Sequence, residues 1–95
     1  MNSSVEMMEY SLFTYPNCAR CDALKSCLSG KNLQAEEFDL SRKESKLKIR
    51  EFLKVLKRDA QGGIIIPTLV VHDKEDVAAV CNSREEFENW LQSKG

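Results

Sequence analysis

Short apolar runs and helix-spaced apolar positions follow one another along the chain, separated by turn-forming residues. Four runs are short and rich in aromatic or β-branched residues, which is typical of strands. In three other segments apolar residues recur every three or four positions, which is typical of helices. The expected strands are Met8 to Tyr15, Gln34 to Leu40, Ile64 to Val71 and Asp76 to Val80, and the expected helices run from Cys18 to Leu28, from Ser41 up to Gln61-Gly62-Gly63, and onward from Ser83.

Local signals mark where these helices begin and end. Ser41 with Glu44, and Ser83 with Glu86, have the spacing of a capping box, in which a hydroxyl and a carboxylate bond to first-turn amides. Gly30 is expected to stop the first helix in a left-handed conformation. The expected core-facing residues are Cys21, Leu24 and Leu28 in the first helix, Leu47, Phe52, Leu53 and Leu56 in the second, and Phe87, Trp90 and Leu91 in the third.

The order of the expected elements is β-α-β-α-β-β-α, which indicates an α/β fold. The opening strand–helix–strand unit predicts two parallel strands with a right-handed crossover. The turn near Lys74 is short enough only for an antiparallel hairpin. We therefore expect a four-stranded mixed sheet with helices on both faces, formed by residues 8–95 as a single domain after a frayed tail at residues 1–7.

Composition narrows the class of protein further. The chain has 95 residues, of which 42% are hydrophobic and 31% are charged, with a net charge of −1, so a wholly disordered chain is excluded. No apolar run approaches the roughly 20 residues of a membrane-spanning helix. The first residues lack the features of a secretory signal or a mitochondrial presequence. We therefore expect a cytoplasmic monomer that enters no membrane.

Positive charge is concentrated in the second expected helix. Residues 41–58 contain eight basic side chains and two glutamates, a local net charge of +6, so the remainder of the chain carries −7. Such a run is usually a solvated helix face, although it can steer an anionic partner. Nucleic acid is not the expected partner, because the whole chain is slightly acidic and no base-stacking aromatic motif accompanies the helix.

Two cysteines lie where the first strand meets the first helix, at Cys18-Ala19-Arg20-Cys21. The unpaired amides and dipole of a helix N-terminus stabilise a thiolate, so Cys18 is a candidate nucleophile. Cys21 lies one turn further along the same face, within reach of a disulfide. In a reducing cytosol, cysteines indicate a redox or metal site more than structural disulfides. Arg20 is expected to point outward and to favour the Cys18 thiolate.

Ile66-Pro67-Thr68 opens the third expected strand. Proline removes one hydrogen bond of a sheet ladder, so its position needs a reason. One interpretation is simple placement at a strand start. The other is a cis peptide that brings backbone groups beside the cysteine pair, where they can pair with an extended substrate.

The segments FTYPNCARC and IPTLVV, taken with the element order, resemble the glutaredoxin branch of the thioredoxin superfamily from Glu9 onward. The resemblance implies a thioredoxin-like fold and a dithiol protein-disulfide oxidoreductase. It implies Cys18 as the attacking thiol, Cys21 as the resolving thiol and Pro67 in a cis peptide, with no bound cofactor. Glutathione or a thioredoxin-reductase-type donor would recharge the pair. The implied substrates are protein disulfides and glutathione mixed disulfides, and the expected substrate-binding residues are Tyr15, Arg20, Ile66, Pro67 and Thr68.

The chain departs from the usual glutaredoxin pattern at positions that bind glutathione. Tyr15 stands where a lysine is typical, and Ala19 stands where a proline follows the first cysteine. A Gly-Gly pair and an aspartate normally precede the last helix, but residues 77–83 read VAAVCNS. These departures predict weak glutathione binding, with Asn82 and Ser83 as the remaining donors near a glutathione carboxylate.

A non-catalytic protein-binding or metal-binding module on the same fold is the alternative function. Five side chains could supply zinc ligands: Cys18, Cys21, Cys27, His72 and Cys81. Cys27 shares a helical face with Leu24, however, so we expect it to pack as a small apolar residue. Cys81 is expected to be a partly buried strand-end residue, with an additional redox thiol as the other interpretation. His72 is expected to be a solvated turn residue.

Overall fold

Four strands form one mixed sheet in the order β2-β1-β3-β4. The computed structural model describes residues 8–73 and 76–94. Strand β1 (Glu9–Thr14) pairs in parallel with β2 (Glu36–Asp39) and antiparallel with β3 (Thr68–His72), and β3 pairs antiparallel with β4 (Val77–Cys81). The predicted α/β fold, the parallel β1–β2 pairing and the antiparallel β3–β4 hairpin are confirmed. The predicted tail, residues 1–7, lies outside the described residues.

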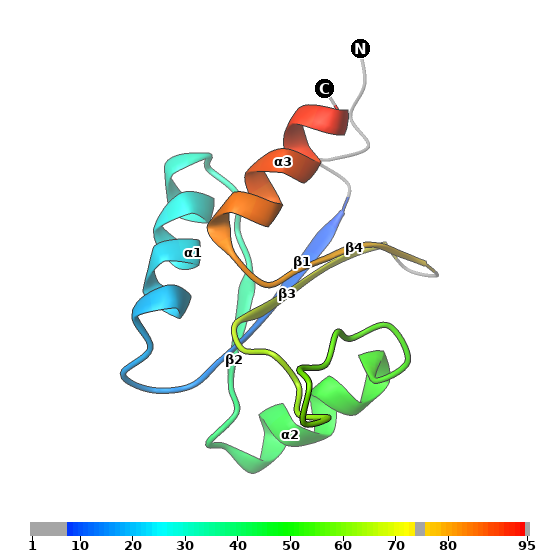
Figure 1. The fold of residues 1–95 in the computed structure, drawn as a ribbon. Coiled ribbons are helices and arrows are strands. Elements are labelled where there is room, and N and C mark those ends of the chain that lie inside the picture. Colours follow the sequence, from blue (N-terminus) through cyan, green and yellow to red (C-terminus); the bar gives the residue numbers. More distant parts are fainter. Residues whose placement is uncertain (1–7, 74–75, 95) are drawn as a thin grey trace.

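Helices cover both faces of the sheet, as predicted (Figure 1). Helices α1 (Ala19–Gly30) and α3 (Arg84–Lys94) lie on one face, and α2 (Lys43–Ile49) with the 3-10 turn η1 (Arg50–Phe52) lies on the other. Each face therefore has its own apolar core. The α1–α3 side includes Leu12, Leu24, Leu69 and Phe87, and the α2 side includes Phe13, Ile49, Phe52 and Val70.

The end of α1 differs from the prediction. The helix continues through Gly30, and Asn32 takes the left-handed conformation instead, with φ of 59°. The amide of Leu33 donates to the carbonyl of Leu28 at 3.0 Å, and the amide of Asn32 donates to Ser29 at 3.1 Å, which is a Schellman motif. Leu33 packs on the core, and its burial places the left-handed residue that ends α1 at Asn32, two residues later than the predicted Gly30.

The second helix is much shorter than predicted. Its cap residue is Arg42, which makes no side-chain capping bond, so the predicted capping box of Ser41 and Glu44 is wrong. The amide of Ser41 instead donates to Oδ1 of Asp39 at 2.9 Å. This turn after β2 uses the Asp39 carboxylate, and the helix begins only after it.

The core face of this helix was also only partly predicted. Phe52 and Leu56 are buried as expected, but Leu47 is 55% exposed and Leu53 is 37% exposed. The inward positions are 45, 49, 52 and 56, so the bulky Ile49 and Phe52 set the face that meets the sheet. Leu47 and Leu53 consequently lie on the outer side of the segment.

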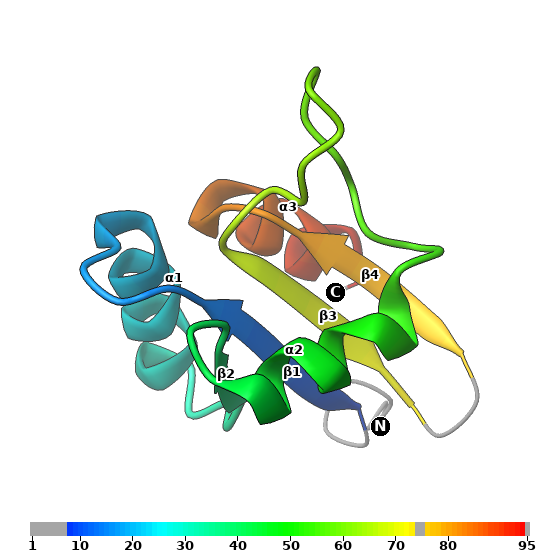
Figure 2. The ribbon, with the colours of Figure 1, turned by 90° about the horizontal axis from the view of Figure 1, so that it is seen from below.

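A 53–67 loop follows η1 and projects from the sheet and helices in Figure 2. Oδ1 of Asp59 accepts hydrogen bonds from the amides of Gln61 and Gly63, both at 2.9 Å. Gly62 has φ of 86°, a conformation that favours glycine. Ile64 makes only an isolated bridge to Arg58, so the predicted strand from Ile64 starts at Thr68. Pro67 cannot donate to the ladder, which accounts for the late start.

The start of α3 follows the prediction closely. Oγ of Ser83 accepts from the amide of Glu86 at 3.1 Å, which is one half of the expected capping box. The Glu86 carboxylate bonds one residue earlier than the motif expects, to the amide of Asn82 at 2.6 Å. Phe87 is fully buried in the core, and Trp90 and Leu91 pack against it half-buried.

Candidate functional site

Cys18 is presented by a tight turn between β1 and α1. Pro16 and Asn17 form the turn, and Asn17 has φ of 58°, which asparagine tolerates better than most residues. Cys18 is extended, with φ of −112° and ψ of 108°, and serves as the N-cap of α1. Its side chain therefore lies at the positive end of the helix.

The two sulfurs occupy different environments. Cys18 is half-buried, whereas Cys21 is 1% exposed. The amide of Cys21 donates to Sγ of Cys18 at 3.1 Å. The two cysteines form a disulfide in this structure, with their Cα atoms 5.2 Å apart. The predicted proximity of the pair is confirmed. Of the two sulfurs, that of Cys18 is the one that accepts a hydrogen bond from a helix amide.

Tyr15 and Arg20 flank this pair in the chain. Both side chains are exposed, and the Tyr15 side chain is 50% exposed. Neither forms a hydrogen bond or ion pair with any other described residue. The structure therefore presents a phenol and a guanidinium on the surface next to Cys18, although it shows no contact between Arg20 and the sulfur.

The start of β3 lies beside the end of β1. The pairing of Phe13 with Thr68 places Pro67 at the same end of the sheet as Cys18. The Ile66–Pro67 peptide is cis, which confirms that prediction. Ile66 is half-buried, while Pro67 and Thr68 are buried. Residues 65–68 form a turn here. The hydroxyl of Thr68 donates to the carbonyl of Ile65 and stabilises this turn.

Asn82, which lies between β4 and α3, holds the same turn, a role that the sequence did not reveal. Its Nδ2 donates to the carbonyls of Ile65 at 3.1 Å and Pro67 at 3.0 Å, and to the hydroxyl of Thr68 at 2.9 Å. Its Oδ1 is buried and accepts no hydrogen bond from the described residues. Asn82 is thus engaged within the protein and is not the free donor that was predicted for a glutathione carboxylate.

A carboxylate of the protein itself occupies the N-terminus of α3. Glu86 accepts from the amide of Asn82 through Oε1, and its Oε2 lies 2.7 Å from Nζ of Lys57 in the 53–67 loop. The hydrogen bond from Lys57, followed by that from Asn82, lowers the pKa of Glu86. An ammonium and an amide that could bind an incoming anion here are therefore already paired with a carboxylate of the protein.

The other two cysteines are buried in the α1–α3 core. Cys27 is 6% exposed, and its thiol lies 3.8 Å from a carboxylate oxygen of Glu88. Cys81 is 3% exposed at the end of β4. Burial raises the pKa of both thiols, that of Cys81 to about 11. The prediction that Cys27 packs as an apolar residue is confirmed, and Cys81 is more deeply buried than expected.

His72 is not the solvated turn residue that was predicted. It is the last residue of β3, and its Nε2 lies 2.9 Å from Oγ of the buried Ser11. Its ring centroid is 5.0 Å from that of Phe52. The β-bulge between Val71 and His72 lets β3 reach one residue further than expected.

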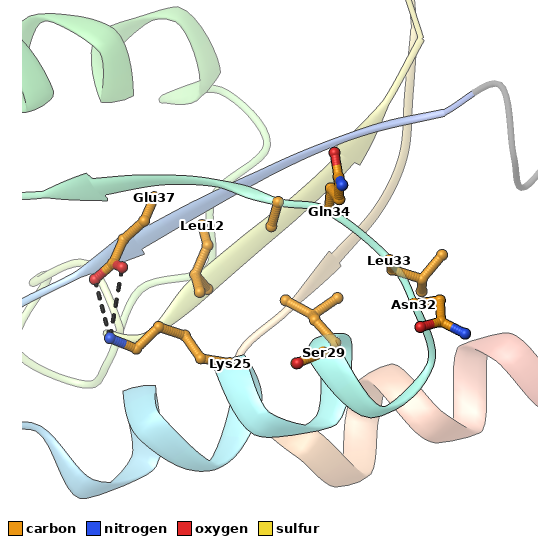
Figure 3. Close-up of a pocket in the computed structure, with 9 residues that line it drawn as sticks. Leu12, Lys25, Ser29, Asn32, Leu33, Gln34 and Glu37 are labelled. Carbon is orange, nitrogen blue, oxygen red and sulfur yellow. Dashed lines mark hydrogen bonds and ion pairs between the residues drawn. The ribbon is translucent and has the colours of Figure 1, made fainter.

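A cavity of about 620 Å³ lies between α1 and the chain that leads into β2 (Figure 3). Lys25 and Glu37 form an ion pair across it at 3.3 Å. None of the predicted site residues lines it. Within residues 8–73 and 76–94, no three histidine, cysteine, aspartate or glutamate side chains are grouped as a metal site requires. None of the described helices is long and apolar enough to cross a bilayer.

Comparison with known proteins agrees with this geometry. The family model for glutaredoxin matches residues 11–75, and no curated protein matches the chain. Glutaredoxin 1 from Francisella tularensis, solved with cacodylate, is 13% identical with a TM-score of 0.60, and the match covers 92% of this chain and 95% of that one. A malarial protein is 17% identical with a TM-score of 0.60, over 92% and 96% of the two chains. Thioredoxin-2, a component of the malaria parasite protein secretion machinery, is 17% identical with a TM-score of 0.58, over 92% and 82%.

Proposed function

The chain belongs to the glutaredoxin family of thiol–disulfide oxidoreductases, and from that premise we propose that it reduces protein disulfides or mixed disulfides through Cys18 and Cys21. The observation that carries the proposal is the asymmetry of the two sulfurs. Cys18 is half-buried at the N-terminus of α1 and accepts an amide hydrogen bond, while Cys21 is buried one turn behind it. This arrangement supports one attacking and one resolving thiol.

The proposed reaction proceeds in two exchanges. The Cys18 thiolate attacks one sulfur of the substrate disulfide, the substrate S–S bond breaks, and the departing thiolate takes a proton from water. Cys21 then loses its proton and attacks Sγ of Cys18, which releases the second substrate thiol and forms the Cys18–Cys21 disulfide. Two electrons pass to the substrate, and an external thiol or reductase must return them.

Four further residues support substrate binding in this proposal. The cis Ile66–Pro67 peptide lies at the same sheet end as Cys18, where its backbone groups can pair with an extended substrate. The exposed guanidinium of Arg20 and phenol of Tyr15 border the nucleophile. We expect Arg20 to favour an acidic substrate surface, and Tyr15 to offer a neutral hydrogen bond, which is weaker than a charge-assisted one.

We further propose that glutathione is a poor electron donor for this protein. Glutathione carries two carboxylates, and the N-terminus of α3 already holds the carboxylate of Glu86. The side-chain amide of Asn82 is committed to the turn at Pro67. A thioredoxin-reductase-type donor is therefore the electron source that we expect to recharge the pair.

Two cysteine substitutions test the proposed function. We expect Cys18→Ser to abolish reduction of a disulfide-bonded test protein such as insulin. Cys21→Ser should retain the first exchange and accumulate a mixed disulfide, because no resolving thiol remains. Mass spectrometry of the trapped species would show the partner bound to Cys18.

Cys27→Ala is the matched control, since Cys27 is buried six residues beyond Cys21, toward the other end of α1. It should leave both the reduction rate and the trapping unchanged. If all three variants reduce the test protein at the wild-type rate, the proposed function is wrong. Stoichiometric zinc or iron in the purified protein, together with that result, would instead indicate the metal-binding alternative.

A further inference from the structure

The outer side of α2 and of the residues that follow it is both basic and apolar. Inward residues of this segment occupy positions 45, 49, 52 and 56. The opposite positions, spaced by three or four residues, form what we call the outer stripe. It consists of Lys43, Lys46, Leu47, Arg50, Leu53 and Lys54, all of which are exposed.

The cations of the outer stripe are not used inside the molecule. Lys43, Lys46, Arg50 and Lys54 form no ion pair with any residue in the described part of the chain. Lys48 and Lys57, by contrast, pair with Glu51 and Glu86. Unpaired like charges on one short segment repel one another, so an anionic partner that covers them gains attraction and relieves that repulsion.

Two large apolar side chains interrupt these charges. Leu47 is 55% exposed and Leu53 is 37% exposed, and both lie among the exposed positions of the segment that carry the four cations. A duplex nucleic acid gives such leucines nothing to pack against, whereas an amphipathic protein segment does. The chemistry of the stripe therefore matches a segment that carries both acidic and apolar residues.

The outer stripe begins at the sheet end that carries the cysteine pair. Thr14, at the end of β1, pairs with Asp39, at the end of β2, and α2 starts four residues after Asp39. Figure 2 shows α2 running from that end across the sheet, on the face opposite α1. A partner that lies along the stripe can thus reach Cys18 with the adjoining part of its chain.

We propose that the outer stripe is a docking surface for an acidic amphipathic segment of the protein whose disulfide Cys18 attacks. The occupant is assigned from charge complementarity and from the exposed leucines. The part of this proposal that makes the partner a substrate rests on the proposed function. Docking itself needs no thiol, so it is measured separately.

The test uses a fluorescein-labelled, cysteine-free peptide whose helical face presents leucines flanked by glutamates. Its binding to the full chain is followed by fluorescence anisotropy. Lys46→Glu should raise the dissociation constant about three- to ten-fold, because an attraction becomes a repulsion at an exposed contact. Leu47→Ser should weaken binding as well, and a peptide with glutamine in place of glutamate should bind more weakly to the wild type.

Lys31→Glu is the matched control, since it makes the same change in net charge at an exposed residue beyond the opposite end of α1. It should leave the dissociation constant within two-fold of the wild type. Equal weakening by Lys31→Glu and Lys46→Glu, or none by either, overturns the proposal. Tighter Lys46-dependent binding to phosphatidylserine vesicles or to duplex DNA than to the peptide also overturns it. Loss of turnover in Cys18→Ser with docking intact separates this result from the proposed function.

Discussion

At the scale of single residues, Asn82 anchors the turn that carries Pro67 beside the cysteine pair. Two N–H groups on its Nδ2 serve three acceptors in the turn that carries Pro67. We expect Asn82→Ala to lower the free energy of unfolding by about 1–3 kcal/mol, since it removes the side-chain donor to the carbonyl of Pro67 and to the buried Thr68 hydroxyl. Reduction of a protein disulfide should slow as well, because the turn at Pro67 loses its anchor.

Chemical denaturation measures the stability of Asn82→Ala and of a control variant, and a disulfide-reduction assay measures their rates. Asn89→Ala is the control, because Asn89 is exposed on α3, the helix that follows Asn82, and its side chain makes no hydrogen bond with the described residues. An Asn82→Ala protein that unfolds at the same denaturant concentration as Asn89→Ala would show that these hydrogen bonds contribute nothing. Asn82→Asp should be at least as unstable as Asn82→Ala, because a carboxylate would face carbonyl oxygens.

Residues with local signals were predictable, and residues with distant partners were not. Cys18, Cys21 and Pro67 are recognised from their immediate neighbours at a strand end. Asn82 acts on residues 14 to 17 positions earlier, and His72 bonds a serine 61 positions earlier. Nothing in a single sequence pairs such positions, so both roles needed the three-dimensional structure.

At the scale of elements, the α2 segment shows where a hydrophobic pattern is insufficient. Four apolar residues within helical spacing predicted one long helix, but the segment ends after η1 and turns into the 53–67 loop. Burial of Ile49 and Phe52 fixes one face, and the Asp59 turn supplies local hydrogen bonds that compete with helix. Because Ile49 and Phe52 fix the face that packs on the sheet, they also determine which leucines of the segment lie on its outer side.

The contact between this loop and α3 predicts how the protein treats glutathione. Glu86→Gln removes a negative charge from the α3 N-terminus and releases Lys57. We expect the kcat/KM for a glutathionylated peptide to rise about three- to ten-fold, because an anion-binding end becomes available. Activity on a protein disulfide should change little.

Glu85→Gln provides the comparison, since Glu85 lies in the same first turn, is exposed and makes no ion pair with the described residues. It should give less than half of the gain. Steady-state rates with the glutathionylated peptide decide between them. If Glu86→Gln and Glu85→Gln behave alike, the Glu86 carboxylate is not what disfavours glutathione.

At the scale of the whole molecule, the topology brings the site together at one end of the sheet. The strand pairings place Thr14 beside Asp39, Phe13 beside Thr68 and Leu69 beside Cys81. The ends of β1, β2 and β4 therefore meet the start of β3. Connection length was enough to predict the parallel β1–β2 pairing and the antiparallel β3–β4 hairpin. The β1–β3 pairing, which brings Pro67 to the end of β1, was seen only in the structure. The conformation of the loops and the ion pairs between elements could not be predicted from the sequence.

The central claim is that Cys18 alone is an activated nucleophile, and the pH dependence of alkylation tests it most directly. Fully reduced protein is treated with iodoacetamide at a series of pH values, and mass spectrometry locates each label. Cys27 and Cys81 should resist labelling near neutral pH, because burial raises the pKa of both thiols, that of Cys81 to about 11. The buried Cys21 should stay protonated there as well.

Labelling of Cys18 should therefore come first. Its rate should rise with an inflection well below the roughly 8.5 of an ordinary thiol, because the α1 amides stabilise the thiolate. An inflection for Cys18 near pH 8.5, or labelling of Cys21 before Cys18, would contradict the claim.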